Sequence, residues 1–147
     1  MTDEVRGRPE RTRAREAALQ LLYRAEVGKL DATAATADYW SEAGEYLEGA
    51  AEFSVREFAE ALFTGVREKE KALDELISSC LQNWRLERVA TVDRLVLRIA
   101  ALELLRGSEP PAVIIDEAIE LARRFGGDDS ARFVNGVIDG IKRKLAE

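Results

Sequence analysis

Few residues of this chain could carry out covalent or metal-dependent chemistry. Its 147 residues include no histidine, so a triad with a histidine base or a histidine-ligated metal site is excluded. The one cysteine, Cys80, excludes a disulfide within the chain and a cysteine cluster for zinc. A lone cysteine could act as a nucleophile, but Cys80 lies on an apolar helical stripe, so we predict a buried structural thiol.

A second candidate for chemistry is the carboxylate pair Asp128–Asp129 in the stretch RFGGDDSARF. Two carboxylates suggest Mg²⁺, but adjacent residues at a helix start rarely converge on one ion. We therefore predict that Asp129 or Ser130 caps a helix. The sequence also lacks a P-loop, a dinucleotide-binding G-x-G-x-x-G and a nucleophile-elbow G-x-S-x-G. A binding protein without metal or cofactor is favoured over an enzyme.

Two features suit contact with nucleic acid. Five arginines lie between Arg6 and Arg15 against one acid, Glu10, although the net charge of the chain is −6. A basic arm of this kind can contact phosphates while an acidic body meets a basic protein. The second feature is Phe133, which follows Arg132. An exposed ring beside polar donors is typical of readers of single-stranded RNA, and core packing of the ring is the alternative.

Composition bounds the class of protein. The length suits one domain, and 46% hydrophobic with 34% charged residues suits a globular protein with a core. No apolar run approaches the roughly 18 residues of a membrane span. The first fifteen residues are too polar for a secretory signal, so we expect a cytoplasmic protein without membrane contact.

Nearly every periodic segment is typical of a helix. Apolar residues at helical spacing predict a first helix from Ala14 that ends at Gly28 and Lys29. Residues 30–53 predict one short helix or two. Ser54 and Glu57 form a capping-box signature, which predicts the start of a helix of about seven turns. We expect that helix to bend at Arg67–Lys71, where the apolar stripe lapses.

Three more helices are expected in the second half. The first spans residues 92–105 and stops at the sequence GSEPP. The next opens near Pro111 and ends at Gly126-Gly127, a natural left-handed cap. The last starts near Ser130, with Val134, Val137, Ile138, Ile141 and Leu145 inward. Within it, Asn135 and Gly136 predict close helix packing or an interhelical hydrogen bond.

No segment shows convincing strand alternation, so we predict an all-α bundle of about six or seven helices. We expect residues 1–10 to form a flexible basic arm and residues 11–147 to form a single all-helical domain that binds RNA or protein.

Three segments together resemble the NusB family of bacterial transcription antitermination factors. They are RTRAREAALQLLY at residues 11–23, VDRLVLRIAALEL at 92–104 and PPAVIIDEAIELARRFGGDDSARFVNGVID at 110–139. The third is the most specific, because F-G, D-S and F-V-N-G follow E-A-x-E-L-A in fixed order. The resemblance runs from about residue 11 to residue 141, with no specific match over residues 28–53.

The resemblance implies an all-α fold of two small helical sub-bundles and no catalysis. It also implies that the chain binds boxA RNA of ribosomal RNA transcripts as a heterodimer with NusE, a ribosomal small-subunit protein. The complex would join NusA, NusG and RNA polymerase and suppress premature termination.

The implied site residues follow from the matched motifs. The residues implied to contact RNA are Arg11, Arg13, Arg15, Asp129, Ser130 and Phe133, where Phe133 stacks a base. We expect the two RNA elements to lie side by side. The residues implied to contact NusE are Tyr23, Glu87 and Asp93. Family members often carry consecutive arginines at the first element, whereas Glu10 and Thr12 interrupt them here.

Two other readings compete. One is a structural helical homodimer without an RNA role, since some family members self-associate. The other is a fragment of a ribosomal RNA methyltransferase, in which similar helical domains occur. The chain has no room for a methyltransferase domain, so we discount this second alternative.

Overall fold

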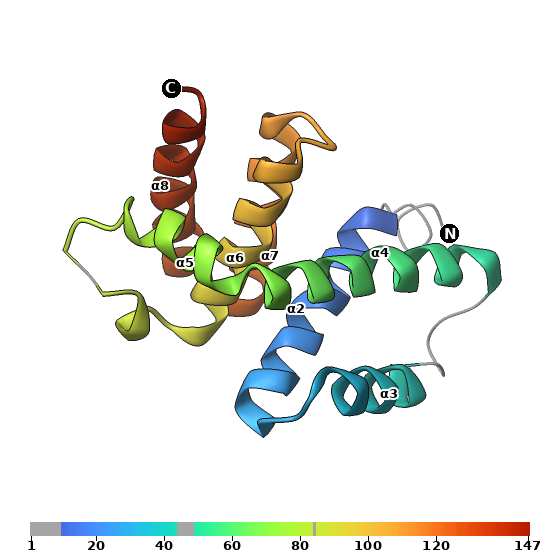
Figure 1. Ribbon diagram of the computed structural model, residues 1–147. Coiled ribbons are helices and arrows are strands. Elements are labelled where there is room, and N and C mark those ends of the chain that lie inside the picture. Colours follow the sequence, from blue (N-terminus) through green and yellow to red (C-terminus); the bar gives the residue numbers. More distant parts are fainter. Residues whose placement is uncertain (1–9, 44–48, 84) are drawn as a thin grey trace. The chain divides into compact units, whose positions relative to one another are not determined.

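The computed structural model describes residues 10–43, 49–83 and 85–147, and these ranges are helical throughout most of their length (Figure 1). The elements are α2 (Glu10–Gly28), α3 (Ala32–Ala43), α4 (Gly49–Glu68), α5 (Glu70–Ser78), the short 3₁₀ helix η1 (Leu86–Arg88), α6 (Thr91–Arg106), α7 (Pro111–Gly126) and α8 (Asp128–Leu145). No strand occurs in these ranges. The all-α prediction is confirmed.

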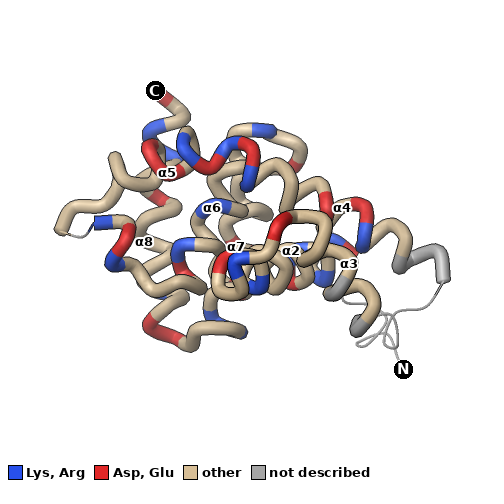
Figure 2. Tube along the Cα trace, turned by 60° about the horizontal axis from the view of Figure 1, so that its bottom comes forward, with Lys and Arg blue, Asp and Glu red and all other residues tan. Residues whose placement is uncertain are grey.

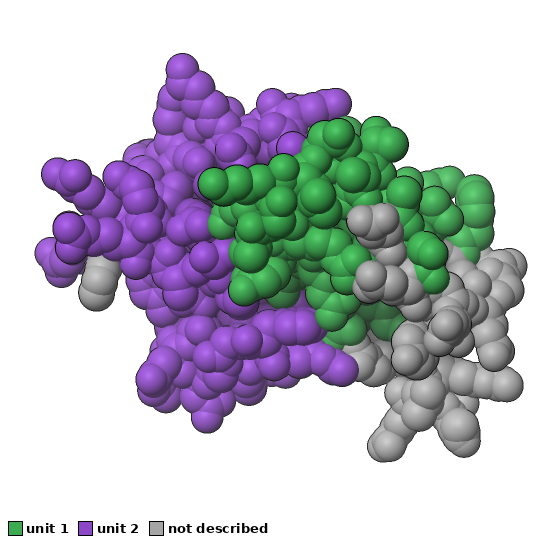
Figure 3. Space-filling view, turned by 90° about the horizontal axis from the view of Figure 1, so that it is seen from below, with its two compact units in different colours: residues 1–64 green, residues 65–147 purple. Residues whose placement is uncertain are grey.

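The chain divides into two compact units, residues 1–64 and residues 65–147, coloured green and purple in Figure 3. The boundary falls within α4. The predicted basic arm of residues 1–10 lies outside the described residues, apart from Glu10, which is the first residue of α2.

Unit 1 is built around α2, which begins four residues before the predicted start. Its apolar stripe is buried as the periodicity indicates, and the helix ends as predicted at Gly28, followed by Lys29 with a φ of 53°. α3 packs against α2, and the Tyr39 hydroxyl donates a 2.6 Å hydrogen bond to Gln20 Oε1. Burial raises the pKa of Tyr39, while nearby Arg24 partly opposes that rise, so the phenol stays protonated as a donor at neutral pH.

The capping box predicted at Ser54 and Glu57 is wrong. α4 begins at Gly49, so Ser54 lies inside the helix and is exposed. The sequence just before Ser54 is rich in alanine, the strongest helix former, and this extends the helix toward the N-terminus. A capping signature therefore marks a helix start only where the preceding residues cannot themselves be helical.

The helix is interrupted within Arg67–Lys71, the segment where a bend is predicted. Two helices replace the single long one, and they meet at Lys69, whose φ of −109° and ψ of 15° leave the helical region. The path is almost continuous, because the backbone N–H of Lys69 still donates to Gly65 at 3.0 Å. Cys80 follows the end of α5 and is only half-buried, so the prediction of a buried thiol on the helical stripe was wrong.

In unit 2, α6 is the central helix, and α5, α7 and α8 all pack against it. Every residue from Leu95 to Glu103 is buried, because neighbours cover α6 on several sides. α6 ends at Gly107, whose φ of 64° gives a left-handed cap, and Pro111 opens α7 as predicted. Of the residues predicted to face inward on α8, four are buried and Leu145 is 39% exposed.

The expected close packing at Asn135 and Gly136 is wrong. Both residues are exposed on α8, and a β-carbon added to Gly136 would meet nothing within 4 Å. Phe125 is also 37% exposed, at the end of α7. The apolar periodicity of one sequence shows roughly which face of a helix is buried. It does not show whether a residue lies at the buried centre of that face or at its exposed edge.

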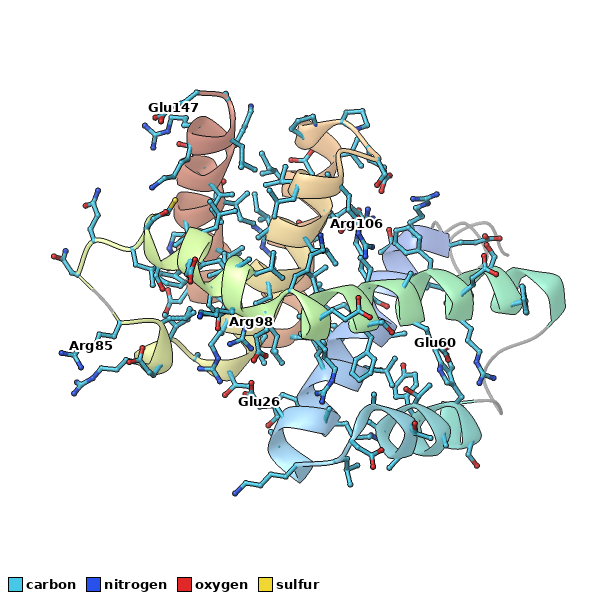
Figure 4. All side chains as sticks on the ribbon, in the orientation of Figure 1. Glu26, Glu60, Arg85, Arg98, Arg106 and Glu147 are labelled. Carbon is cyan, nitrogen blue, oxygen red and sulfur yellow. The ribbon has the colours of Figure 1, made fainter. Side chains whose placement is uncertain are left out.

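A partly buried ion pair connects α5 and α6. Arg98, labelled in Figure 4, is 7% exposed. Its Nε donates to Asp74 Oδ1 at 2.7 Å and its Nη2 donates to Asp74 Oδ2 at 3.0 Å. Glu70 lies 3.4 Å from the third guanidinium nitrogen. A bidentate pair of this kind fixes both the distance and the rotation of α5 against α6.

We expect the Gly65→Ala variant to be destabilised by about 1 kcal/mol or more, because the site is overpacked by a methyl group. A β-carbon there would lie 2.3 Å from Arg106 Nη2 and 2.9 Å from Leu102 Cδ2. The arginine end can move, but the leucine is packed. The matched control is Gly136→Ala, which should gain about 0.5–1 kcal/mol from helix propensity alone. Equal shifts in the urea midpoints of the two variants would contradict the packing argument.

Among the described helices, none combines the length and the apolar character needed to cross a membrane.

Candidate nucleic-acid and partner interface

The first candidate RNA element lies at the start of α2, in unit 1. Arg11 is exposed, and its guanidinium carbon lies 4.3 Å from the centroid of the Phe58 ring on α4. Arg15 approaches the same ring at 5.8 Å, but it is only 3% exposed. Stacking on an aromatic face holds a guanidinium in place.

The three predicted arginines therefore differ in access. Arg11 is exposed, Arg13 is half-buried, and Arg15 is buried. The Nε of Arg13 is enclosed and has no hydrogen-bond partner among the described residues. A groove runs beside Arg11 and is lined by Glu10, Arg11, Ser54, Glu57, Phe58 and Ala61. The arginines Arg6 and Arg8 lie outside the described residues.

The second candidate element is the turn between α7 and α8, in unit 2. Gly126 is the last residue of α7, and Gly127 has a φ of 90° with a ψ of −177°. The predicted left-handed cap is therefore corrected: φ is positive, but ψ is extended, a conformation that is almost confined to glycine. It turns the chain so that α8 begins at once with Asp128.

The predicted side-chain cap of α8 is also wrong. Its N-cap is Gly127, and no side chain accepts a capping hydrogen bond there. Asp128 and Asp129 instead stand in the first turn, where their charges complement the positive end of the helix dipole. Asp128 pairs with Arg123 at 3.3 Å and Asp129 pairs with Arg132. These side chains are largely exposed, so the pairs hold them only weakly.

Phe133 lies one turn into α8 and is half-buried, next to the fully buried Val134. Its neighbour Arg132 has a side chain that is 74% exposed. The ring thus has one side anchored in unit 2 and another within reach of solvent, which is the arrangement that base stacking requires. In the ranges that the structure describes, no group of three or more acidic or cysteine side chains could hold a metal ion.

The predicted partner residues also differ in access. Tyr23 on α2 is 44% exposed, and Glu87 in η1 is exposed. Figure 2 colours the basic and acidic positions along the chain, and in the sequence Glu87 stands between Arg85 and Arg88. Asp93, at the start of α6, is only 8% exposed.

Sequence reasoning missed Val27. It is 58% exposed and lies one helical turn after Tyr23, on the same side of α2. An exposed tyrosine and valine in adjacent turns give an apolar contact stripe of the kind that protein partners cover. The signal was available in the spacing, but a valine near a helix end looks the same whether it is buried or exposed.

The chain is similar to known proteins over most of its length. The NusB family model matches residues 12–143. The chain is 46% identical to the transcription antitermination protein NusB of Sorangium cellulosum, over 92% of this chain and 93% of that protein. It is 43% identical to the same-named protein of Bacillus velezensis, over 92% and 98% of the two chains.

The chain belongs to the NusB family. Family membership confirms the prediction made from the three matched segments and the expectation of a binding factor in place of an enzyme. The structure of T. maritima NusB superposes with a TM-score of 0.76 at 36% identity, and 91% of each chain is covered. A crystal structure of the antitermination factors NusB and NusE in complex with dsRNA gives a TM-score of 0.80 at 22% identity, over 92% of this chain and 97% of that chain. This second likeness supports the NusB-type all-α fold.

Proposed function

We propose that this NusB-family chain is a bacterial transcription antitermination factor that binds boxA RNA of ribosomal RNA transcripts as a heterodimer with NusE. The observation that carries the proposal is that both RNA elements expected from the sequence present accessible groups suited to RNA. Arg11 on α2 is an exposed cation. Phe133 on α8 is a partly exposed ring that follows Asp129 and Ser130 in the sequence.

On the RNA side, we assign different tasks to the two elements. Arg11 and the half-buried Arg13 donate to phosphate oxygens, the usual source of affinity for RNA. The buried Arg15 supports them by packing near the Phe58 ring that also carries Arg11. At the start of α8, Asp129 and Ser130 contact sugar or base edges, while a base stacks on Phe133.

On the protein side, Tyr23, Val27 and Glu87 supply the direct contacts with NusE. The two α2 residues provide apolar area, and Glu87 provides a carboxylate for a basic ribosomal protein. Asp93, which the resemblance implies as a further NusE contact, is only 8% exposed, so we do not count it among the direct contacts. We further propose that the heterodimer acts in the cytoplasm and joins NusA, NusG and RNA polymerase, a proposal that family membership supports.

Fluorescence anisotropy with labelled RNA tests the function. We expect the chain to bind boxA RNA in preference to a scrambled RNA, and NusE to tighten that binding. The logarithm of affinity should fall with the logarithm of salt concentration by about 0.7 for each phosphate neutralised. If neither RNA binds with NusE present, and gel filtration shows a tight dimer, the chain is instead a structural homodimer module.

We expect the Glu87→Lys variant to bind NusE about three- to tenfold more weakly, because a repulsive contact replaces an attractive one at the rim of the interface. Asp93→Lys is unsuitable for this test, since a lysine at a buried position would disturb folding. Surface plasmon resonance at two salt concentrations measures the effect, and circular dichroism checks the helical content. The control is Glu75→Lys, an exposed position on α5. Similar losses for both variants would remove Glu87 from the interface.

A further inference from the structure

A carboxylate oxygen in unit 2 lacks a hydrogen-bond donor. Asp93 is 8% exposed, and its Oδ1 is enclosed with no hydrogen-bond partner among the described residues. Leaving a buried charged acceptor unsatisfied is costly. We expect this oxygen to accept a hydrogen bond when the protein is bound to its ligand. The residues beside the oxygen indicate which group donates that bond.

The groups beside this oxygen belong to the α7–α8 turn. A β-carbon placed on Gly126 would lie 3.6 Å from Asp93 Oδ1, 2.3 Å from Ser130 Oγ and 2.7 Å from Ser130 Cβ. Ser130 therefore occupies space that any larger residue at position 126 would take. Gly126 is needed here for room, whereas the neighbouring Gly127 is needed for its positive φ. We call Asp93 and Gly126 the Ser130 seat.

We infer that the Ser130 seat orients the Ser130 hydroxyl for RNA, an inference that rests on the function proposed above. In the RNA-binding state the Ser130 O–H donates to Asp93 Oδ1, the unpartnered acceptor that lies beside the same position, Gly126. The lone pairs of Ser130 Oγ then face outward as acceptors. Asp93 is thus a positioning residue that acts on RNA through Ser130.

This arrangement determines which RNA groups the turn can read. Ser130 oriented in this way and the exposed Asp129 both offer acceptors. Phosphate oxygens are acceptors as well, and the carboxylates of Asp93, Asp128 and Asp129 would repel them. The complementary RNA groups are hydrogen-bond donors: the 2′-hydroxyl of ribose or the N–H groups of a base edge. The turn therefore contributes selectivity, while the arginines of α2 contribute charge attraction.

A double-mutant cycle tests the seat, with boxA RNA affinity in the presence of NusE as the readout. We expect Asp93→Asn to weaken RNA binding in the wild-type background but to have little effect when Ser130 is already alanine, a non-additivity of about fivefold. Asp116→Asn, an exposed position on α7, is the charge-matched control. Thermal unfolding of each variant separates positioning from destabilisation, because a stability loss would appear in both backgrounds.

A second variant tests the seat without altering Asp93. Gly126→Ala should displace the Ser130 hydroxyl and weaken RNA binding to the level of Ser130→Ala, with no further loss when the two are combined. Repeating the Ser130→Ala measurement on the 2′-deoxy oligonucleotide distinguishes the donors. An effect lost on the deoxy strand identifies the 2′-hydroxyl, and an effect that persists identifies a base N–H.

Three results would overturn the inference. Additive effects of Asp93→Asn and Ser130→Ala would show that the two side chains act independently. Loss of NusE binding by Asp93→Asn, with RNA affinity of the free chain unchanged, would make Asp93 a partner residue. Wild-type protein that binds no boxA RNA would overturn the proposed function as well, whereas additive variants of a wild-type protein that does bind would overturn the seat alone.

Discussion

A Phe133→Ala variant is expected to bind boxA RNA more weakly by about 1–3 kcal/mol, which corresponds to roughly 5- to 150-fold in affinity. The reason is that the ring is half-buried on α8, so unit 2 holds it rigidly while part of its surface remains open to a base. A preordered ring loses little side-chain entropy when a base stacks on it. Titration of labelled boxA RNA, with NusE at saturation, measures the loss.

The control for this variant is Leu145→Ala, which truncates another partly exposed apolar side chain on α8, near its opposite end. It should leave RNA affinity unchanged. Thermal unfolding is recorded for both variants, since Phe133 also packs beside the core. A Phe133→Ala protein with reduced stability and full RNA affinity would show that the ring serves only the core.

The largest effect on stability is expected for Asp74→Ala, which should cost about 3 kcal/mol. The substitution removes the bidentate partner of Arg98 and leaves a guanidinium that is 7% exposed facing a truncated side chain. Glu70, at 3.4 Å and with a side chain 54% exposed, replaces little of that interaction because water screens it. Urea unfolding followed by circular dichroism measures the change.

The double variant Asp74→Leu/Arg98→Met separates the value of the pair from the cost of breaking it. Replacing both charges by apolar side chains removes the buried guanidinium together with Asp74, so stability should return to within about 1 kcal/mol of the wild type. An equal loss in the single and double variants would show that this pair itself, and not the desolvated guanidinium, provides the stability.

Local pattern was sufficient for most of the secondary structure. α7 starts at Pro111 because the proline ring suits the first turn of a helix. The break at Lys69 coincides with the lapse of the apolar stripe. Both are properties of short segments. The predicted caps were wrong because a cap depends on more than the short segment that carries its signature. Whether Ser54 starts a helix depends on the residues before it, and whether Ser130 caps one depends on the path of Gly127.

The sequence by itself determined the helical class, the absence of histidine and disulfide chemistry, and the membership of the NusB family through the order of its motifs. Only the tertiary structure decided which of the candidate side chains are accessible. Arg11 and Arg15 have the same chemistry and lie one turn apart, yet one is exposed and the other is 3% exposed. The two predicted partner residues with carboxylates also differ in access, because Glu87 is exposed and Asp93 is only 8% exposed.

The physical reason is that helical periodicity specifies a direction around one helix axis, whereas burial depends on what other elements place in that direction. No property of Asp93 in the sequence shows that the α7–α8 turn closes over its carboxylate. Likewise, the spacing of Gly126 and Ser130 is that of any two residues one turn apart. Their contact exists only because the chain reverses at Gly127 and brings the start of α8 back onto the end of α7.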